Sequence, residues 1–183
     1  MRAFLAFEVS PEVRDNLLKV EEELKLTRAD VKVVERENLH FTVKFLGEIP
    51  DSMVDEVDKR VRALALRRME VDVRGLGAFP DTRRPRVIWA GVSPHDLAAI
   101  SSNGQQVVDA LEGVGETDER GFHPHITVAR VRSPRNMEAL ASMLRDYSTK
   151  DFGRTPISAL KLKSSTLTPA GPTYRDIKEY ILQ

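Results

Sequence analysis

Cysteine is absent from this chain of 183 residues, which excludes disulfides, a thiolate nucleophile and any metal site built on cysteine. Hydrophobic runs long enough to span a membrane are absent too, and the apolar run at residues 1–9 is too short for a secretory signal. We therefore expect a soluble, cytoplasmic protein with no membrane partner. The length fits one domain, or two small lobes that share a core.

Charge of one sign is not in excess, since 28 Lys and Arg balance 28 Asp and Glu. A net charge of zero argues against a protein that coats nucleic acid generally, but it allows recognition of a single terminal phosphate. A Walker sequence, an HExxH sequence and an EF-hand loop are all missing. We therefore expect no cofactor, no metal and no ATP dependence, with a monomer as the default state.

Histidine is scarce, and two of the four histidines open the same short frame. Residues 40–43 read His-Phe-Thr-Val, and residues 125–128 read His-Ile-Thr-Val. The alternation of polar and apolar residues predicts two half-buried strands, on which residues i and i+2 share a face. His40 and Thr42 then lie together on one strand, as do His125 and Thr127 on the other.

Two imidazoles that face one phosphorus are suited to general acid and base catalysis of in-line displacement. The neutral ring takes a proton from the attacking oxygen, and the protonated ring gives one to the leaving oxygen. Thr42 and Thr127 can donate hydrogen bonds to the non-bridging oxygens. A single His-x-Thr strand is usually structural, and duplication alone can preserve two copies without chemistry, so the residues by themselves leave both interpretations open.

Other segments repeat as well. The sequence Val-Ser-Pro ends an apolar run at residues 9–11 and again at 92–94, where Ser as N-cap and Pro at the first helical position predict a helix start. A further helix is expected after each His strand, over 54–64 and from Ser133, and then strands over 71–73 onward and 157–167. The segments 75–85 and 113–121 are predicted to be loops.

The fold class predicted from this pattern is α+β with an internal duplication over about residues 1–78 and 85–170. Two pseudo-symmetric lobes with antiparallel sheets would surround a central cleft, helices would cover their outer faces, and strands can exchange between the lobes. The whole chain, 1–183, would form one two-lobed domain.

Several segments together resemble one known family. They are residues 40–47 (HFTVKFLG), 79–80 (FP), 85–92 (PRVIWAGV), 123–130 (HPHITVAR) and 168–174 (TPAGPTY). This pattern resembles the RNA 2′,3′-cyclic phosphodiesterases, also called 2′-5′ RNA ligases, of the two-histidine phosphoesterase superfamily.

The resemblance implies hydrolysis of a 2′,3′-cyclic phosphate at an RNA 3′ end to a 2′-phosphomonoester, with transfer RNA or its halves among the candidate partners. It implies that His40 protonates the leaving 3′ oxygen and that His125 activates water. The near symmetry of the two frames does not by itself assign these roles. Joining of the cyclic phosphate to a 5′-hydroxyl RNA end, RNA-end binding without turnover, and a metal site of His40, His123 and His125 are the alternatives.

Three further residues are candidates for substrate binding. A guanidinium at Arg130 suits phosphate, but strict alternation puts it opposite His125 unless the strand has a bulge. Phe45 stands in the equivalent place of the first half, where it either stacks on a base or packs in the core. Tyr174 follows a Pro-Ala-Gly-Pro turn and resembles a cleft-lining family position, with a role on the surface or in the core as the alternative.

For each of the remaining charged candidates, a structural or solvent-exposed role is the alternative to a role in the site. Lys44 shares the parity of His40, so it either adds charge to the site or reaches solvent at an edge. His123 is expected to be structural or to support His125, and His95 to be solvated at a helix start. The arginines of one loop form either a basic lip for an RNA backbone or a solvated loop: Arg83, Arg84 and Arg86.

Overall fold

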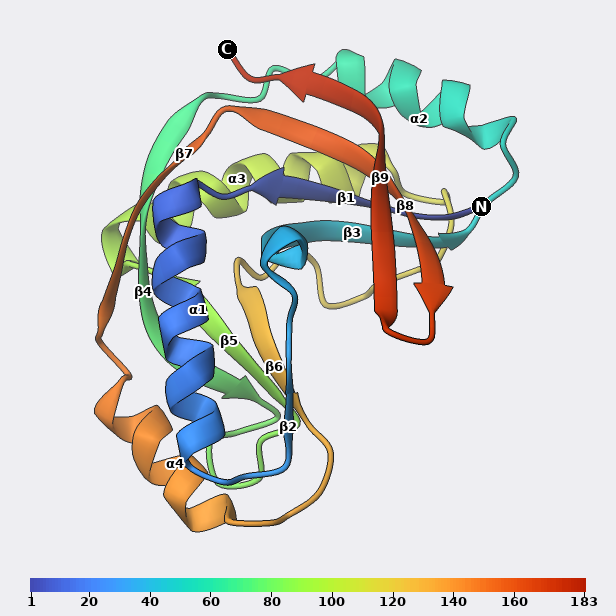
Figure 1. Ribbon diagram of the computed structural model, residues 1–183. Coiled ribbons are helices and arrows are strands. Elements are labelled where there is room, and N and C mark those ends of the chain that lie inside the picture. Colours follow the sequence, from blue (N-terminus) through green and yellow to red (C-terminus); the bar gives the residue numbers. More distant parts are fainter.

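The computed structural model describes all residues 1–183 and contains four α-helices and nine β-strands (Figure 1). The helices are α1 (Pro11–Leu26), α2 (Met53–Arg62), α3 (Pro94–Ala110) and α4 (Met137–Asp146), with a short 3₁₀ helix at Arg36–Asn38. The strands are β1 (Arg2–Glu8), β2 (Val31–Val33), β3 (His40–Glu48), β4 (Met69–Phe79), β5 (Val87–Val92), β6 (Ile126–Val131), β7 (Asp151–Ile157), β8 (Ala159–Thr168) and β9 (Gly171–Ile181).

All strands join in one antiparallel sheet that curls through the molecule in the order β7-β4-β5-β6-β3-β1-β8-β9, with β2 beside β6 (Figure 1). The predicted α+β class with antiparallel pairing is confirmed. The two halves of the chain also exchange strands. β4 ends the first half but pairs with β5 of the second half, and β8 ends the second half but pairs with β1 of the first half.

The two His strands lie side by side at the centre of the sheet, where Phe41 pairs with Ile126. These residues hold equivalent positions in the two repeated frames. An antiparallel pair of equivalent residues lies on a twofold axis, so the pseudo-symmetry axis of the duplication passes between β3 and β6.

One apolar core of 40 buried residues supports the whole sheet. It includes Phe41 and Ile126 together with the apolar faces of α1 and α3, so these helices cover the sheet face opposite the histidines. In α1 these buried residues recur at helical spacing: Val13, Leu17, Val20 and Leu24. Ser10 caps this helix as predicted, because its hydroxyl accepts the Val13 N–H at 3.3 Å. None of the helices combines the length and apolar character needed to cross a membrane.

Gly104 lies within α3 for a packing reason. A Cβ at this position would lie 1.9 Å from the Phe122 ring, so the glycine is what lets Phe122 pack against the helix. Phe122 is buried and also meets the Phe7 ring edge-on at 6.2 Å. The packing anchors the end of the predicted loop 113–121, which the structure confirms, three residues before His125.

Two predicted boundaries are wrong. The segment 75–79 is not a loop, because β4 continues to Phe79; Gly75, at φ 80°, forms an irregularity in the strand. The fourth helix begins at Met137 and not at Ser133. The preceding loop docks on the end of α1 instead, where Arg135 and Asn136 donate hydrogen bonds to the Arg28 carbonyl at 3.1 and 3.3 Å.

Glu21 is an acidic residue on the buried face of α1. Only 2% of its surface is exposed, and its Oε1 has no hydrogen-bond partner. Burial raises the pKa of its carboxyl from 4.5 to about 8. The folded chain therefore holds a proton that the unfolded chain releases between these pH values, and stability falls as the pH rises through that window.

We expect Glu21→Gln to raise the melting temperature at pH above 8 and to change it little near pH 4, where both side chains are neutral. Thermal unfolding followed by circular dichroism across this range measures the effect. Glu119→Gln, an exposed carboxylate without an ion pair, is the control. An equal change at both ends of the pH range would contradict burial of a protonated Glu21.

Candidate functional site

The register of β3 and β6 brings the two His-x-Thr frames onto one patch of the sheet. Because Phe41 pairs with Ile126, His40 lies across from Thr127, and Thr42 lies across from His125. All four side chains lie on the face opposite Phe41 and Ile126, which are fully buried in the core. The duplication thus assembles two imidazoles and two hydroxyls around one axis.

Both His strands carry a bulge at the same place in the repeat. Against β1, the register of β3 steps from Thr42 to Lys44, and against β5, the register of β6 steps from Thr127 to Ala129. Each bulge adds one residue and reverses the parity beyond it. Phe45 and Arg130 therefore lie on the same face as the histidines. For Arg130, this is the bulge that a position on the face of His125 required.

The bulge in β3 shows that the expected contribution of Lys44 to the charge of the site is wrong. Its side chain lies on the opposite face, is buried, and reaches the Glu116 carbonyl at 3.4 Å. The prediction that Phe45 packs in the core is also wrong, because its side chain is 54% exposed. Its ring centroid lies 6.0 Å from that of Phe4.

Aromatic rings flank both histidines. The Phe4 ring stacks on His40 at 5.2 Å, and the Tyr174 ring lies 5.6 Å from His40 and 4.8 Å from Phe4. In the second half, Phe79 meets His125 edge-on at 5.0 Å, and Trp89 lies 6.3 Å from it. The two histidines therefore lie in partly apolar surroundings, which disfavour their charged forms.

Sequence reasoning did not assign Phe4, Phe79 or Trp89 to the site. Trp89 lies over two glycines, since a Cβ at Gly77 would stand 2.3 Å from the indole ring and one at Gly91 would stand 3.1 Å from it. The glycines on neighbouring strands were visible in the sequence, but only the strand pairing shows that they make room for one ring.

His40 is buried, with 7% of its surface exposed. Its Nε2 lies 3.1 Å from the Thr42 hydroxyl, and its Nδ1 is buried without a hydrogen-bond partner. Burial lowers the pKa of His40 from 6.5 to about 4. The imidazole is therefore neutral at pH 7 in the unliganded protein.

His125 has a defined tautomer. Its Nδ1 lies 2.6 Å from the His123 carbonyl oxygen, which only accepts hydrogen bonds, so Nδ1 carries the proton and Nε2 keeps its lone pair. Burial lowers the pKa of His125, while the bond to His123 opposes the shift. Neutral His125 is therefore arranged as a base at Nε2, and His123 supports it through its backbone.

Arg130 lies near His125, and Tyr174 lies beside His40. The positive charge of Arg130 lowers the pKa of His125, and it opposes the rise that burial causes in the pKa of Tyr174. Arg130 is exposed and forms no ion pair, so its guanidinium is free to bind an anion near His125. The loop arginines 83, 84 and 86 are exposed just after Phe79, and Asp81 accepts the backbone N–H groups of the first two.

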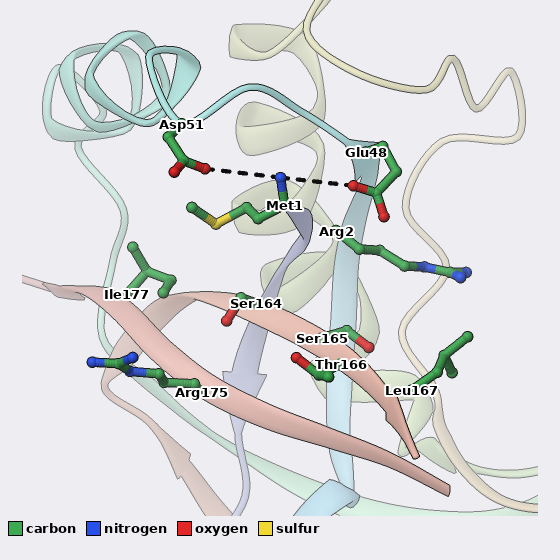
Figure 2. A pocket seen from close by; sticks show the side chains of 10 residues that line it. All are labelled: Met1, Arg2, Glu48, Asp51, Ser164, Ser165, Thr166, Leu167, Arg175 and Ile177. Carbon is green, nitrogen blue, oxygen red and sulfur yellow. Dashed lines mark ion pairs between the residues drawn. The ribbon is translucent and has the colours of Figure 1, made fainter. Parts of the chain in front are cut away.

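A cavity of about 580 Å³ lies apart from the histidines, between the start of β1, the end of β3, the loop before α2 and the β8–β9 hairpin (Figure 2). The carboxylates of Glu48 and Asp51 face the amino group of Met1 at 3.7 and 3.8 Å. Arg2 also lines the cavity, and its charge reaches Tyr174. The mixed charge and the absence of either histidine separate this cavity from the two-histidine site.

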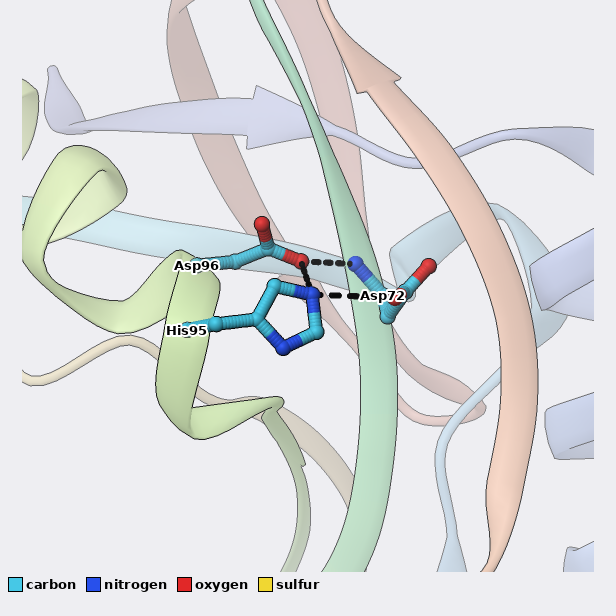
Figure 3. A group of neighbouring side chains, drawn as sticks. All are labelled: Asp72, His95 and Asp96. Carbon is cyan, nitrogen blue, oxygen red and sulfur yellow. Dashed lines mark hydrogen bonds and ion pairs between the residues drawn. The ribbon is translucent and has the colours of Figure 1, made fainter.

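The one group of side chains with metal-like spacing is Asp72, His95 and Asp96 (Figure 3). Asp96 already accepts the Asp72 N–H at 2.8 Å and the Ser93 hydroxyl at 2.9 Å, while Arg154 pairs with Asp72 at 3.0 Å. These contacts are hydrogen bonds that join the start of α3 to β4, together with an ion pair. The alternative metal site of His40, His123 and His125 does not bring its ligand atoms within 4.8 Å of one another.

Known proteins resemble the chain over its full length. A family model described as LigT-like phosphoesterase matches residues 7–89. An RNA 2′,3′-cyclic phosphodiesterase of Methanothermobacter thermautotrophicus is 37% identical and covers 100% of this chain and 99% of its own length. One from Aquifex aeolicus is 33% identical and covers 100% and 97%.

Solved structures share the fold. The TT0787 protein of Thermus thermophilus superposes with a TM-score of 0.78 at 27% identity, covering 100% of this chain and 98% of its own. Escherichia coli LigT, solved in complex with 3′-AMP, superposes with a TM-score of 0.78 over the same shares at 19% identity. The resemblance inferred from the motifs is confirmed, and the chain belongs to the LigT-like phosphoesterase family.

Proposed function

We propose that the protein hydrolyses the 2′,3′-cyclic phosphate at an RNA 3′ end to a 2′-phosphomonoester, without metal or ATP. The pairing of the two His-x-Thr frames across β3 and β6 carries this proposal, because it places two imidazoles on one patch. The full-length relatives named RNA 2′,3′-cyclic phosphodiesterase support the substrate class.

His125 is the proposed base, since its Nε2 lone pair is directed away from the bond that Nδ1 makes to His123. It removes a proton from water, whose oxygen attacks phosphorus, while protonated His40 gives its Nε2 proton to the leaving 3′ oxygen. The P–O3′ bond breaks, and the phosphate stays on O2′. The two catalytic residues are thus His125 and His40.

Substrate binding is assigned to five residues around them. Thr42 and Thr127 donate hydrogen bonds to the non-bridging phosphate oxygens, and Arg130 balances the charge that develops on them. Exposed Phe45 and half-buried Tyr174 offer ring faces for the terminal base. Transfer RNA and its halves are candidate substrates, and we propose that the protein acts as a cytoplasmic monomer.

Replacement of either histidine tests the assignment. We expect His40→Ala and His125→Ala each to lower kcat by about 10²–10⁴-fold, because each removes one proton-transfer group. The assay uses a short RNA with a 2′,3′-cyclic phosphate end, excess chelator and mapping of the product end group. His95→Ala is the control, since that side chain is 70% exposed and lies outside the site.

Full activity of either single variant would contradict the two-histidine mechanism. Binding of the RNA that survives both substitutions, with no product from the native protein, would favour a non-catalytic RNA-end module. Addition of a 5′-hydroxyl RNA to the same assay detects ligation as a 2′-5′ linked product.

The pH dependence follows from burial. In the free protein, burial lowers the pKa of His40 to about 4 and that of His125 below 6.5. The mechanism needs protonated His40 together with neutral His125, and the population of that form falls both above the higher and below the lower of the two pKa values. We expect kcat/KM, which reports on the free protein, to be bell-shaped with its maximum below pH 6.5.

A bound phosphate anion favours the protonated ring, so the kcat maximum should lie at a higher pH than the kcat/KM maximum. Steady-state rates between about pH 4 and 9 measure both parameters. A kcat/KM maximum on the alkaline side of pH 8 would contradict burial as the dominant influence on the two rings.

A further inference from the structure

Glu8 is the last residue of β1 and pairs directly with His40 on β3. Side chains of directly opposed residues lie on one sheet face, with Cβ atoms about 4.5–5.5 Å apart. The carboxylate therefore lies within reach of the His40 ring. That ring is the one with a buried Nδ1 that lacks a hydrogen-bond partner.

A cluster of charges holds Glu8 in place. Its Oε2 accepts Arg14 of α1 at 2.5 Å, and its Oε1 lies 2.6 Å from Lys163 of β8. Asp176 of β9 binds Lys163 and Lys161, each at 2.7 Å. Burial raises the pKa of Glu8, but Lys163, Arg14 and Lys161 outweigh burial and lower it overall, so Glu8 is ionised.

The second half of the chain has no equivalent carboxylate. Alignment of the repeated Val-Ser-Pro segments places Gly91 where the first half has Glu8. Gly91 makes room for Trp89, and His125 binds a backbone carbonyl instead. A carbonyl orients a neutral ring, whereas a carboxylate also balances the charge of a protonated one, so the asymmetry distinguishes an acid from a base.

We propose that Glu8 is a positioning residue that supplies the counter-charge for protonated His40, accepts its Nδ1–H, and so keeps Nε2 for proton donation to the leaving oxygen. This inference rests on the proposed function and assigns the acid role to His40 from its surroundings. Glu8 acts through His40 and does not contact substrate.

The charged groups around His40 determine whether a substitution raises or lowers the pKa of its imidazole. Burial lowers the pKa of His40 most strongly, Glu8 raises it, and Lys163 and Arg14 lower it. Tyr174 faces the ring from β9, where it is neutral at pH 7, and Asp176 and Lys161 largely offset each other through their ion pair.

Glu8→Gln and Lys163→Met should therefore shift the pH dependence of kcat in opposite directions. We expect Glu8→Gln to move the alkaline limb of the kcat profile to lower pH and to reduce kcat at pH 8 by about 10-fold or more. Lys163→Met should move the same limb to higher pH. A purely structural role would lower activity without such opposed shifts.

A direct titration of His40 by NMR separates this inference from the proposed function. The pKa of His40 should fall in Glu8→Gln and rise in Lys163→Met, whether or not the protein turns over RNA. Exposed Glu12, which forms no ion pair, provides the control Glu12→Gln. If Glu8→Gln does not fold, the double variant Glu8→Gln/Lys163→Met removes one charge of each sign, and its His40 pKa should lie below that of Lys163→Met.

An unchanged His40 pKa in Glu8→Gln, or a shift of the same sign in both single variants, would overturn the role of Glu8. Absence of RNA hydrolysis by the native protein would instead overturn the proposed function, and the titration would still decide whether Glu8 and His40 are coupled.

Discussion

The antiparallel contact between β3 and β6 is the interaction on which the site depends. A single register pair, Phe41 with Ile126, joins the two halves of the chain and sets the twofold relation between the His-x-Thr frames. A slip of one residue would turn every side chain of one strand to the other face. The two frames would then no longer share one surface, so the core that holds this register also maintains the chemistry.

Burial determines much of the site's electrostatics. Aromatic rings and neighbouring strands remove water from both histidines, and the pKa of each ring falls as a result. Near neutral pH the free site holds two neutral rings and an unpaired Arg130. In the proposed reaction, the phosphate anion of the substrate supplies the charge that favours protonation of one ring.

The symmetry of the site is incomplete, and its differences are informative. The bulges in β3 and β6 occupy equivalent positions, yet one presents the apolar ring of Phe45 and the other the guanidinium of Arg130. Likewise His40 lies across from the carboxylate of Glu8, whereas His125 binds a carbonyl. The two repeated halves thus give each histidine different surroundings, as the proposed acid and base roles require.

The sequence by itself determined the two His strands, the helix starts at Ser10 and Ser93, the α+β class and the family, because periodicity, capping and motifs are local. It did not determine the bulges, since an extra residue in a strand depends on which partner strand lies alongside. For that reason Lys44 was placed on the wrong face, and Phe45 was left between core and site. The start of α4 and the continuation of β4 through Gly75 were also decided by tertiary contacts, with α1 and β5. Only the folded sheet brings Phe4, Phe79, Trp89 and Glu8 to the histidines, because these contacts join segments that the chain separates by tens of residues.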